Sequence, residues 1–319
     1  IDHVEKESKV KSFFTPNDVY YESEFQCALR TINAQKAWDL WDFHSLTPKS
    51  NTVLLASVDS GVDYTHPDLE NNIWINQKEI PVEIFNGIDA DSNEFISTNE
   101  LINFLFDFNL DGLVNLKDAL HANSPLINGI DDDQNEFIDD IIGWDSSGNS
   151  QIDAISARAD NDPFPDYSST EWSHGTHVAG LLGASTDNNI GISSVAFDVK
   201  VIPVKGARAD SDYNPSLMDT YDGVLYAAKA GYYAGTFTII NCSWGSSIDN
   251  TSTISTFQNA VINVVYNNYN SLIVAAAGNG KQDSDGDWMN LEEYAAFFPA
   301  SFDNVISVSP LDCNGNWGG

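Results

Sequence analysis

The sequence predicts an α/β fold in which a mainly parallel sheet is covered by helices on both faces. Short runs of β-branched and aliphatic residues recur along the chain, and stretches with helical apolar spacing lie between the later runs. The predicted strands are residues 53–58, 199–204, 238–241, 272–276 and 305–308. Strands that are apolar throughout, rather than alternating, are typical of a parallel sheet that is buried on both faces.

Two amphipathic helices are predicted between these strands. The first is indicated by apolar residues at helical spacing, which are Leu217, Tyr221, Val224, Leu225 and Ala228. The second is indicated in the same way by Ile254, Phe257, Val261, Val264 and Val265. In a parallel sheet of this kind, functional side chains gather where the strands end at their carboxyl edge.

Composition limits the partners that this chain can have. Its 319 residues are enough for one large domain or two small ones. The 47 acidic side chains against 14 basic ones give a net charge of −33, which repels nucleic acid and anionic membranes. No apolar run reaches the roughly 18 residues that a membrane-spanning helix needs. Three cysteines, Cys27, Cys242 and Cys313, allow at most one internal disulfide.

Residues from about 69 to 166 break the strand–helix rhythm and are interpreted as an insertion. They are rich in Asp, Asn and Ile, and they contain the near-repeats 86–96 and 128–138, which match at nine of eleven positions. Only Lys78, Lys117 and Arg158 offset their carboxylates. Because this stretch repels itself and has little apolar periodicity, we do not expect it to build a core of its own.

Three short motifs hold candidate catalytic side chains. Asp59 ends the first predicted strand and is followed by Ser60-Gly61, His174 opens the run His-Gly-Thr-His-Val-Ala-Gly, and Asn279 follows Ala-Ala-Gly after an apolar strand. Each motif alone is common, because strand-ending aspartates and asparagines between glycines often form turns, and a lone histidine is often structural.

Together, and in this order, the three motifs resemble the boxes of the subtilase family, whose Asp before His order is subtilisin's own. The resemblance runs from about residue 16 to the end and implies a subtilisin-like three-layer fold and a serine endopeptidase. It implies that Asp59 orients and stabilises the imidazole, that His174 is general base and then acid, and that Asn279 donates to the oxyanion. It also implies that His177 is a packing residue.

Ser243, Trp244 and Gly245 resemble the family's substrate-binding edge, where an extended peptide adds as a strand. The implied partners are protein or peptide substrates and the enzyme's own propeptide, and the implied location is extracellular. Residues 1–14 resemble the end of a propeptide, although a disordered terminus is the alternative. Residues 15–319 then form the catalytic domain.

The family's nucleophilic serine is absent from this sequence. No Gly-Thr-Ser-x-Ala-x-Pro box occurs, and only residues 280–319 follow Asn279. We therefore expect a catalytic domain that stops before its nucleophile and does not hydrolyse peptides by the triad route. The alternative is a non-catalytic, calcium-binding subtilase-like protein.

Calcium is the implied cofactor, because one segment of the insertion fits the ligand spacing of an EF-hand loop well, another fits it at most positions and a third fits it in part. The candidate ligands are Asp89, Asp91, Asn93 and Glu100 in the first loop, Asp107, Asn109, Asp111 and Asp118 in the second, and Asp131, Asp133 and Asn135 in the third. The second loop has the turn glycine, whereas the first has Glu94 in its place. The alternative is that these residues only form turns. By resemblance, Asp18, Asp68 and Asn188 stand at the family's calcium site near the N-terminus.

Overall fold

A six-stranded parallel sheet forms the centre of the computed structural model, which describes residues 14–22, 26–38, 53–148, 158–166, 169–196, 199–210, 212–248, 255–279 and 296–315. The strand order is β10-β8-β6-β1-β3-β2, and every pairing is parallel. The strands are β1 (Val53–Asp59), β2 (Trp144–Asp145), β3 (Lys200–Lys205), β6 (Phe237–Cys242), β8 (Ser271–Ala276) and β10 (Val305–Val308). The five predicted strands are therefore confirmed.

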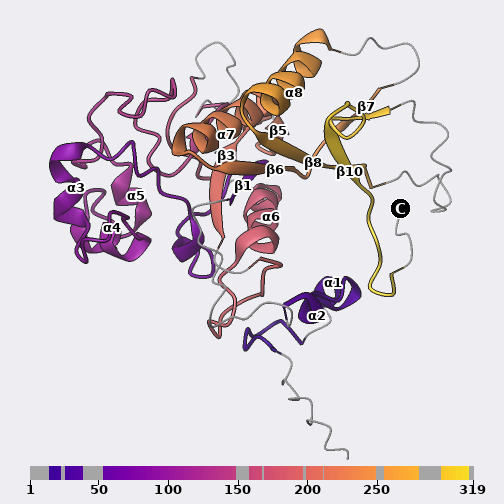
Figure 1. Ribbon diagram of the computed structural model, residues 1–319, viewed down its shortest axis with the longest axis horizontal. Helices are drawn as coiled ribbons and strands as arrows, with labels where there is room; N and C mark the ends of the chain where they lie inside the picture. The colour runs from indigo at the N-terminus through magenta and orange to yellow at the C-terminus, as the bar shows by residue number, and fades with distance from the viewer. Residues whose placement is uncertain are drawn as a thin grey trace, which may run out of the picture.

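Helices cover both faces of this sheet, as predicted. Figure 1 shows α7 (Thr220–Ala234) and α8 (Thr256–Asn268) on one face and α6 (His174–Gly183) on the other. The α6 helix lies close to β3 because Gly183 has no side chain: a Cβ there would be 2.5 Å from Val201 Cγ2. The three layers of the predicted fold are confirmed.

Local signals fix the ends of the two predicted helices. The Ser255 side chain accepts the backbone N–H of Gln258 at the start of α8, and α7 ends at Gly235, whose φ of +82° is left-handed. Three residues of the predicted apolar faces were assigned wrongly, and a fourth, Ile254, lies outside the described residues. Leu217 lies before α7 in β5 (Pro215–Leu217), which pairs antiparallel with β4 (Ala207–Ala209). Phe257 and Val264 of α8 are exposed, by 60% and 37%.

The insertion buries many apolar side chains, which the sequence did not predict, but it shares this core with the central sheet through Ala179 of α6 and Val201 of β3. It folds into η2 (Glu70–Asn72), α3 (Val82–Ile88), α4 (Thr98–Phe104) and α5 (Leu116–Ala119), and Figure 1 shows the three α-helices together at one side of the molecule. Their buried side chains form one cluster with Ile80, Ile88, Ile96, Leu101, Leu105, Leu116, Leu126, Ile141 and Ile142. Helices this short bury only one to three side chains each, which gives no periodic signal in the sequence.

The N-terminal and C-terminal parts of the described chain are joined covalently. Cys27, in α1 (Cys27–Thr31), forms a disulfide with Cys313, and α1 and α2 (Ala34–Trp38) pack around the buried Trp38. The remaining cysteine, Cys242, is buried and free. The predicted propeptide end lies almost wholly outside the described residues. Among those that are described, no helix combines the length and apolar character that crossing a membrane requires.

Candidate active site

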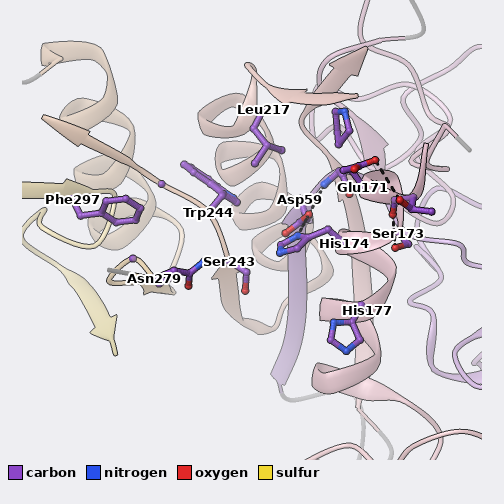
Figure 2. A pocket seen from close by; sticks show the side chains of 16 residues that line it. Asp59, Glu171, Ser173, His174, His177, Leu217, Ser243, Trp244, Asn279 and Phe297 are labelled. Atoms are coloured by element: carbon purple, nitrogen blue, oxygen red, sulfur yellow. Dashed lines mark hydrogen bonds and ion pairs between the residues drawn. The ribbon is translucent and has the colours of Figure 1, made fainter. Parts of the chain in front are cut away.

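A hydrogen bond between Asp59 and His174 forms the centre of the site. Asp59 ends β1 with 1% exposure, and its Oδ1 lies 2.7 Å from Nδ1 of His174, the first residue of α6 (Figure 2). The same Oδ1 accepts the backbone N–H of Ser60 at 2.7 Å. Asp59 Oδ2 is buried and has no hydrogen-bond partner among the described residues. The His174 side chain is 52% exposed, so its other ring nitrogen can reach a substrate.

The start of α6 is held against the end of β1 by backbone contact. A Cβ on Gly175 would lie 2.2 Å from the Gly61 carbonyl oxygen and 3.1 Å from Asp59 Cβ. Ser60 Oγ accepts the Gly175 N–H at 3.0 Å and donates to the Trp172 carbonyl at 3.1 Å, where Trp172 belongs to η3 (Thr170–Ser173). The small residues of both motifs therefore allow the distance that the Asp59–His174 bond requires.

The Asp59 carboxylate favours the protonated form of His174. The hydrogen bond that His174 donates to Asp59 raises the pKa of His174, partial burial lowers it, and the negative charge of Asp59 raises it further, with a net upward shift. Because the pKa of His174 is higher in the folded state than in the unfolded state, protonation of His174 stabilises the fold, and this contribution is complete below the unfolded pKa. It is lost as pH rises through the folded pKa.

A pocket of about 610 Å³ brings together all six residues that the sequence assigned to catalysis and substrate binding. These are Asp59, His174, Asn279, Ser243, Trp244 and Gly245. Figure 2 shows Ser243 and Asn279 across the pocket from the Asp59–His174 pair. The Trp244 indole N–H donates to the Val58 carbonyl at 2.8 Å, which ties this wall of the pocket to β1.

Strand pairing explains why Asn279 and Ser243 share one pocket. The parallel strands β6 and β8 pair with Cys242 opposite Ala275, so the segments that follow them leave the sheet side by side. Asn279 is exposed in the pocket, and Gly278 before it has a left-handed φ of +101°.

Three pocket residues were missed or wrongly assigned from the sequence. His177 does not pack into the core: it is exposed and lines the pocket, three residues after His174 on the same side of α6. That helical spacing was the signal that could have identified it. Glu171 and Phe297 also line the pocket, and the sequence gives no local signal for Phe297, because it comes from a segment far along the chain.

The three predicted loops of the insertion share one backbone frame. In each loop the first aspartate accepts the N–H groups of the residues four and five positions later, and these aspartates are Asp89, Asp107 and Asp131. The second of those donors is left-handed in every loop, with φ of 64° at Glu94, 89° at Gly112 and 80° at Glu136. Glu94 therefore adopts the sharp turn that seemed to require glycine.

A last carboxylate closes each frame. Glu100 accepts the N–H groups of Ala90 and Asp91, and Asp118 accepts those of Phe108 and Asn109. Both carboxylates also complete capping boxes at the starts of α4 and α5.

The third loop has no such residue of its own and uses Glu79, which precedes it by 52 residues and was missed by the sequence analysis. Glu79 accepts the N–H groups of Asp132, Asp133 and Asp139. Burial raises the pKa of Glu79 to about 7. The shared frame with the other two loops, rather than sequence spacing, identifies its role.

The chemistry of these donors fits a hard cation, because every candidate ligand atom is an oxygen. Among the described residues, one oxygen from each of Asp89, Asp91 and Glu100 lies within 4.8 Å of the others, and the same holds for Glu79, Asp133 and Asp140. The second loop, which the sequence favoured, is not one of these two groups.

The candidate site near the N-terminus is also assembled. Asn188 Nδ2 donates to Asp68 Oδ1 at 2.8 Å, and the Asn188 backbone N–H donates to Asp18 Oδ1 at 3.1 Å. Burial, opposed by hydrogen bonds and reinforced by the charge of Asp18, raises the pKa of Asp68. The three residues that resemblance placed together are therefore neighbours in the structure.

We expect Asp59→Asn to lower the pKa of His174 towards its ordinary value of about 6.5, because the variant removes the negative charge that favours the imidazolium. NMR titration of the histidine ring protons measures this pKa, with the His174 signal assigned by its loss in His174→Gln. Asp63→Asn is the control, since the Asp63 carboxylate bonds to Thr65 rather than to His174. An unchanged His174 pKa in Asp59→Asn would contradict the assignment.

Comparison with known proteins agrees with this geometry. The sequence model of the subtilase family matches residues 50–317 of this chain. The chain is 26% identical over 312 residues to the thermophilic serine proteinase of Bacillus sp. (strain AK1), covering 98% of this chain and 50% of that protein. It is 32% identical over 172 residues to the extracellular protease of Xanthomonas campestris pv. campestris, covering 52% of this chain and 26% of that protein.

Among solved structures, sphericase superposes with a TM-score of 0.45 at 22% identity, covering 84% of this chain and 58% of that one. The chain thus spans half or less of the length of the two curated relatives described above. The family match covers most of the sequence, and the chain belongs to the subtilase family of serine proteases.

Proposed function

We propose that this chain forms most of the catalytic domain of a secreted serine endopeptidase that hydrolyses proteins or peptides. The single observation that carries the proposal is the 2.7 Å bond between Asp59 and His174 at the edge of a pocket that also contains Asn279. An acid–base pair facing an amide donor is the arrangement that acyl transfer needs.

In this mechanism Asp59 holds Nδ1 of His174, so Nε2 takes the proton from the attacking hydroxyl. The new bond joins the hydroxyl oxygen to the substrate carbonyl carbon, whose oxygen becomes negative and accepts a hydrogen bond from the Asn279 amide. Asp59 stabilises the imidazolium, which gives its proton to the amine nitrogen as the C–N bond breaks and an acyl ester remains on the hydroxyl oxygen. Water then attacks the acyl carbon, His174 takes the proton of that water, and the proton passes to the hydroxyl oxygen as the ester C–O bond breaks and the acid product leaves.

The proposed nucleophile is a serine outside these 319 residues, since no Gly-Thr-Ser box occurs among them. Substrate backbone would pair with the segment Ser243–Gly245 beside the pocket. The extracellular name of the Xanthomonas relative and the Cys27–Cys313 disulfide support secretion, because disulfides persist in oxidising compartments. We also propose that residues 1–14 are the end of a propeptide.

A protein expressed from a coding sequence that is extended downstream should contain a serine that reacts with a fluorophosphonate reagent. The 319-residue chain should not react. His174→Ala in the extended protein should abolish labelling, because the hydroxyl loses its base. His66→Ala is the control and should be labelled as the parent is, since His66 lies outside this pocket. A folded extended protein that resists labelling would disprove the protease proposal.

We further propose that calcium occupies the loops of the insertion and the site near Asp68. The ligands would be the carboxylate and amide oxygens of the three loops, with Glu79 completing the third, and those of Asp18, Asp68 and Asn188. The bound ion would offset the repulsion among these carboxylates and order the backbone around them. We assign it no step in catalysis.

Chelation should lower the melting temperature and expose the insertion to proteolysis first, because an ion that binds only the folded state stabilises it. Asp107→Ala with Asp111→Ala should make the insertion similarly labile at saturating calcium. The control is Glu83→Ala with Asp303→Ala, which removes the same charge from exposed positions outside the loops. Calorimetric titration counts the bound calcium ions. If the loop variant binds as many ions as the parent, the second loop is only an acidic turn and holds no calcium.

A further inference from the structure

The pocket has two walls beside Asn279, and the space between them determines which residue can precede the scissile bond. This inference rests on the proposed peptidase function. One wall is the segment Ser243–Gly245 after β6, and the other is the segment Ala276–Gly278 after β8. The carbonyl that Asn279 polarises belongs to the residue on the acyl side of the bond. The side chain of that residue therefore enters between the two walls.

The ring of Phe297 lies against both walls. Phe297 belongs to β9 (Ala296–Phe298), which pairs antiparallel with β7 (Ser246–Ile248) just after Gly245. A Cβ on Gly245 would lie 2.3 Å from Phe297 Cε1, so the ring occupies the space above this glycine. A Cβ on Gly278 would lie 3.5 Å from Cδ2 and Cε2 of the same ring, which is ordinary contact.

The backbone of Phe297 is fixed in place on both sides. Its N–H donates to Ser301 Oγ at 3.0 Å, and its carbonyl accepts the Ser301 N–H at 2.8 Å. The next residue, Phe298, is buried in the main core, where its ring centre lies 4.4 Å from that of Phe302. These contacts hold the backbone of Phe297 beside the main core, with its ring against the two pocket walls.

Among the described residues that line the pocket, none beside this ring is charged. Glu171 and His177 lie on the His174 side of the pocket, away from Phe297 (Figure 2). On the Phe297 side the walls are made of glycine, alanine, serine and tryptophan. An ionised substrate side chain would find no partner among these described residues and would lose its hydration.

We propose that Phe297 limits the residue before the scissile bond to small uncharged side chains, namely glycine, alanine and serine. A longer aliphatic or aromatic side chain would overlap the ring, and overpacking of a filled apolar space is destabilising. Removing the ring should open the pocket to the side chains that it now excludes.

The test is the binding of acetylated tetrapeptide acids, which mimic the acyl-side product, to the 319-residue chain. Two peptides that differ only in a terminal Ala or Phe are titrated while NMR follows the His174 ring and the Asn279 side-chain amide. We expect the Ala peptide to bind at least about tenfold more tightly, the scale on which apolar pockets discriminate by size. Phe297→Ala should raise affinity for the Phe peptide by about tenfold and change that for the Ala peptide by less than about threefold.

Phe297→Leu should fall between the parent and Phe297→Ala, and it provides a second test if the alanine variant does not fold. Phe257→Ala, at an exposed phenylalanine of α8, should behave as the parent does. Equal binding of both peptides by the parent, or no gain for the Phe peptide in either Phe297 variant, would overturn this inference alone. Binding of neither peptide, with the His174 and Asn279 signals unmoved, would overturn the proposed function together with it.

Discussion

The close contact between the start of α6 and the end of β1 is the constraint on which the site depends. Gly175 lies so near the Gly61 carbonyl that a Cβ would be 2.2 Å from that oxygen. The Ser60 hydroxyl, just after the end of β1, hydrogen-bonds to the backbone of Gly175 in α6 and of Trp172 just before it, which fixes the position of α6 relative to β1. Only at this separation do a strand-ending carboxylate and a helix-starting imidazole come within 2.7 Å.

The parallel sheet adds the rest of the pocket to this pair. Because β1, β6 and β8 are neighbours, their carboxyl ends deliver Asp59, Ser243 and Asn279 to one edge. The insertion is attached to the same framework: Tyr226 of α7 donates to Asp140 at 2.8 Å, and the Phe137 ring lies 4.7 Å from the Tyr226 ring. Order in the acidic loops is therefore coupled to a helix that packs on the central sheet.

The strands were predictable from sequence because each is a short, contiguous apolar run, and the Asp59–His174 pair was predicted because two short motifs resemble those of the subtilase family. Asp59 and His174 are each flanked by the small residues that let their elements approach, so the local sequence contains the geometric requirement. The core of the insertion was not predictable, since its helices are too short to show a period. Glu79 and Phe297 were missed for another reason: each acts beside residues that are distant along the chain, and only the fold brings them there.

The most direct test of this account is the substitution Gly175→Ala, followed by NMR titration of His174. The added methyl group must move α6 away from β1, so the Asp59–His174 hydrogen bond should lengthen and break. The pKa of His174 should then fall from its raised position, because that bond is the main cause of the upward shift. A folded Gly175→Ala protein in which the His174 pKa is unchanged would contradict the claim that this glycine contact positions His174 against Asp59.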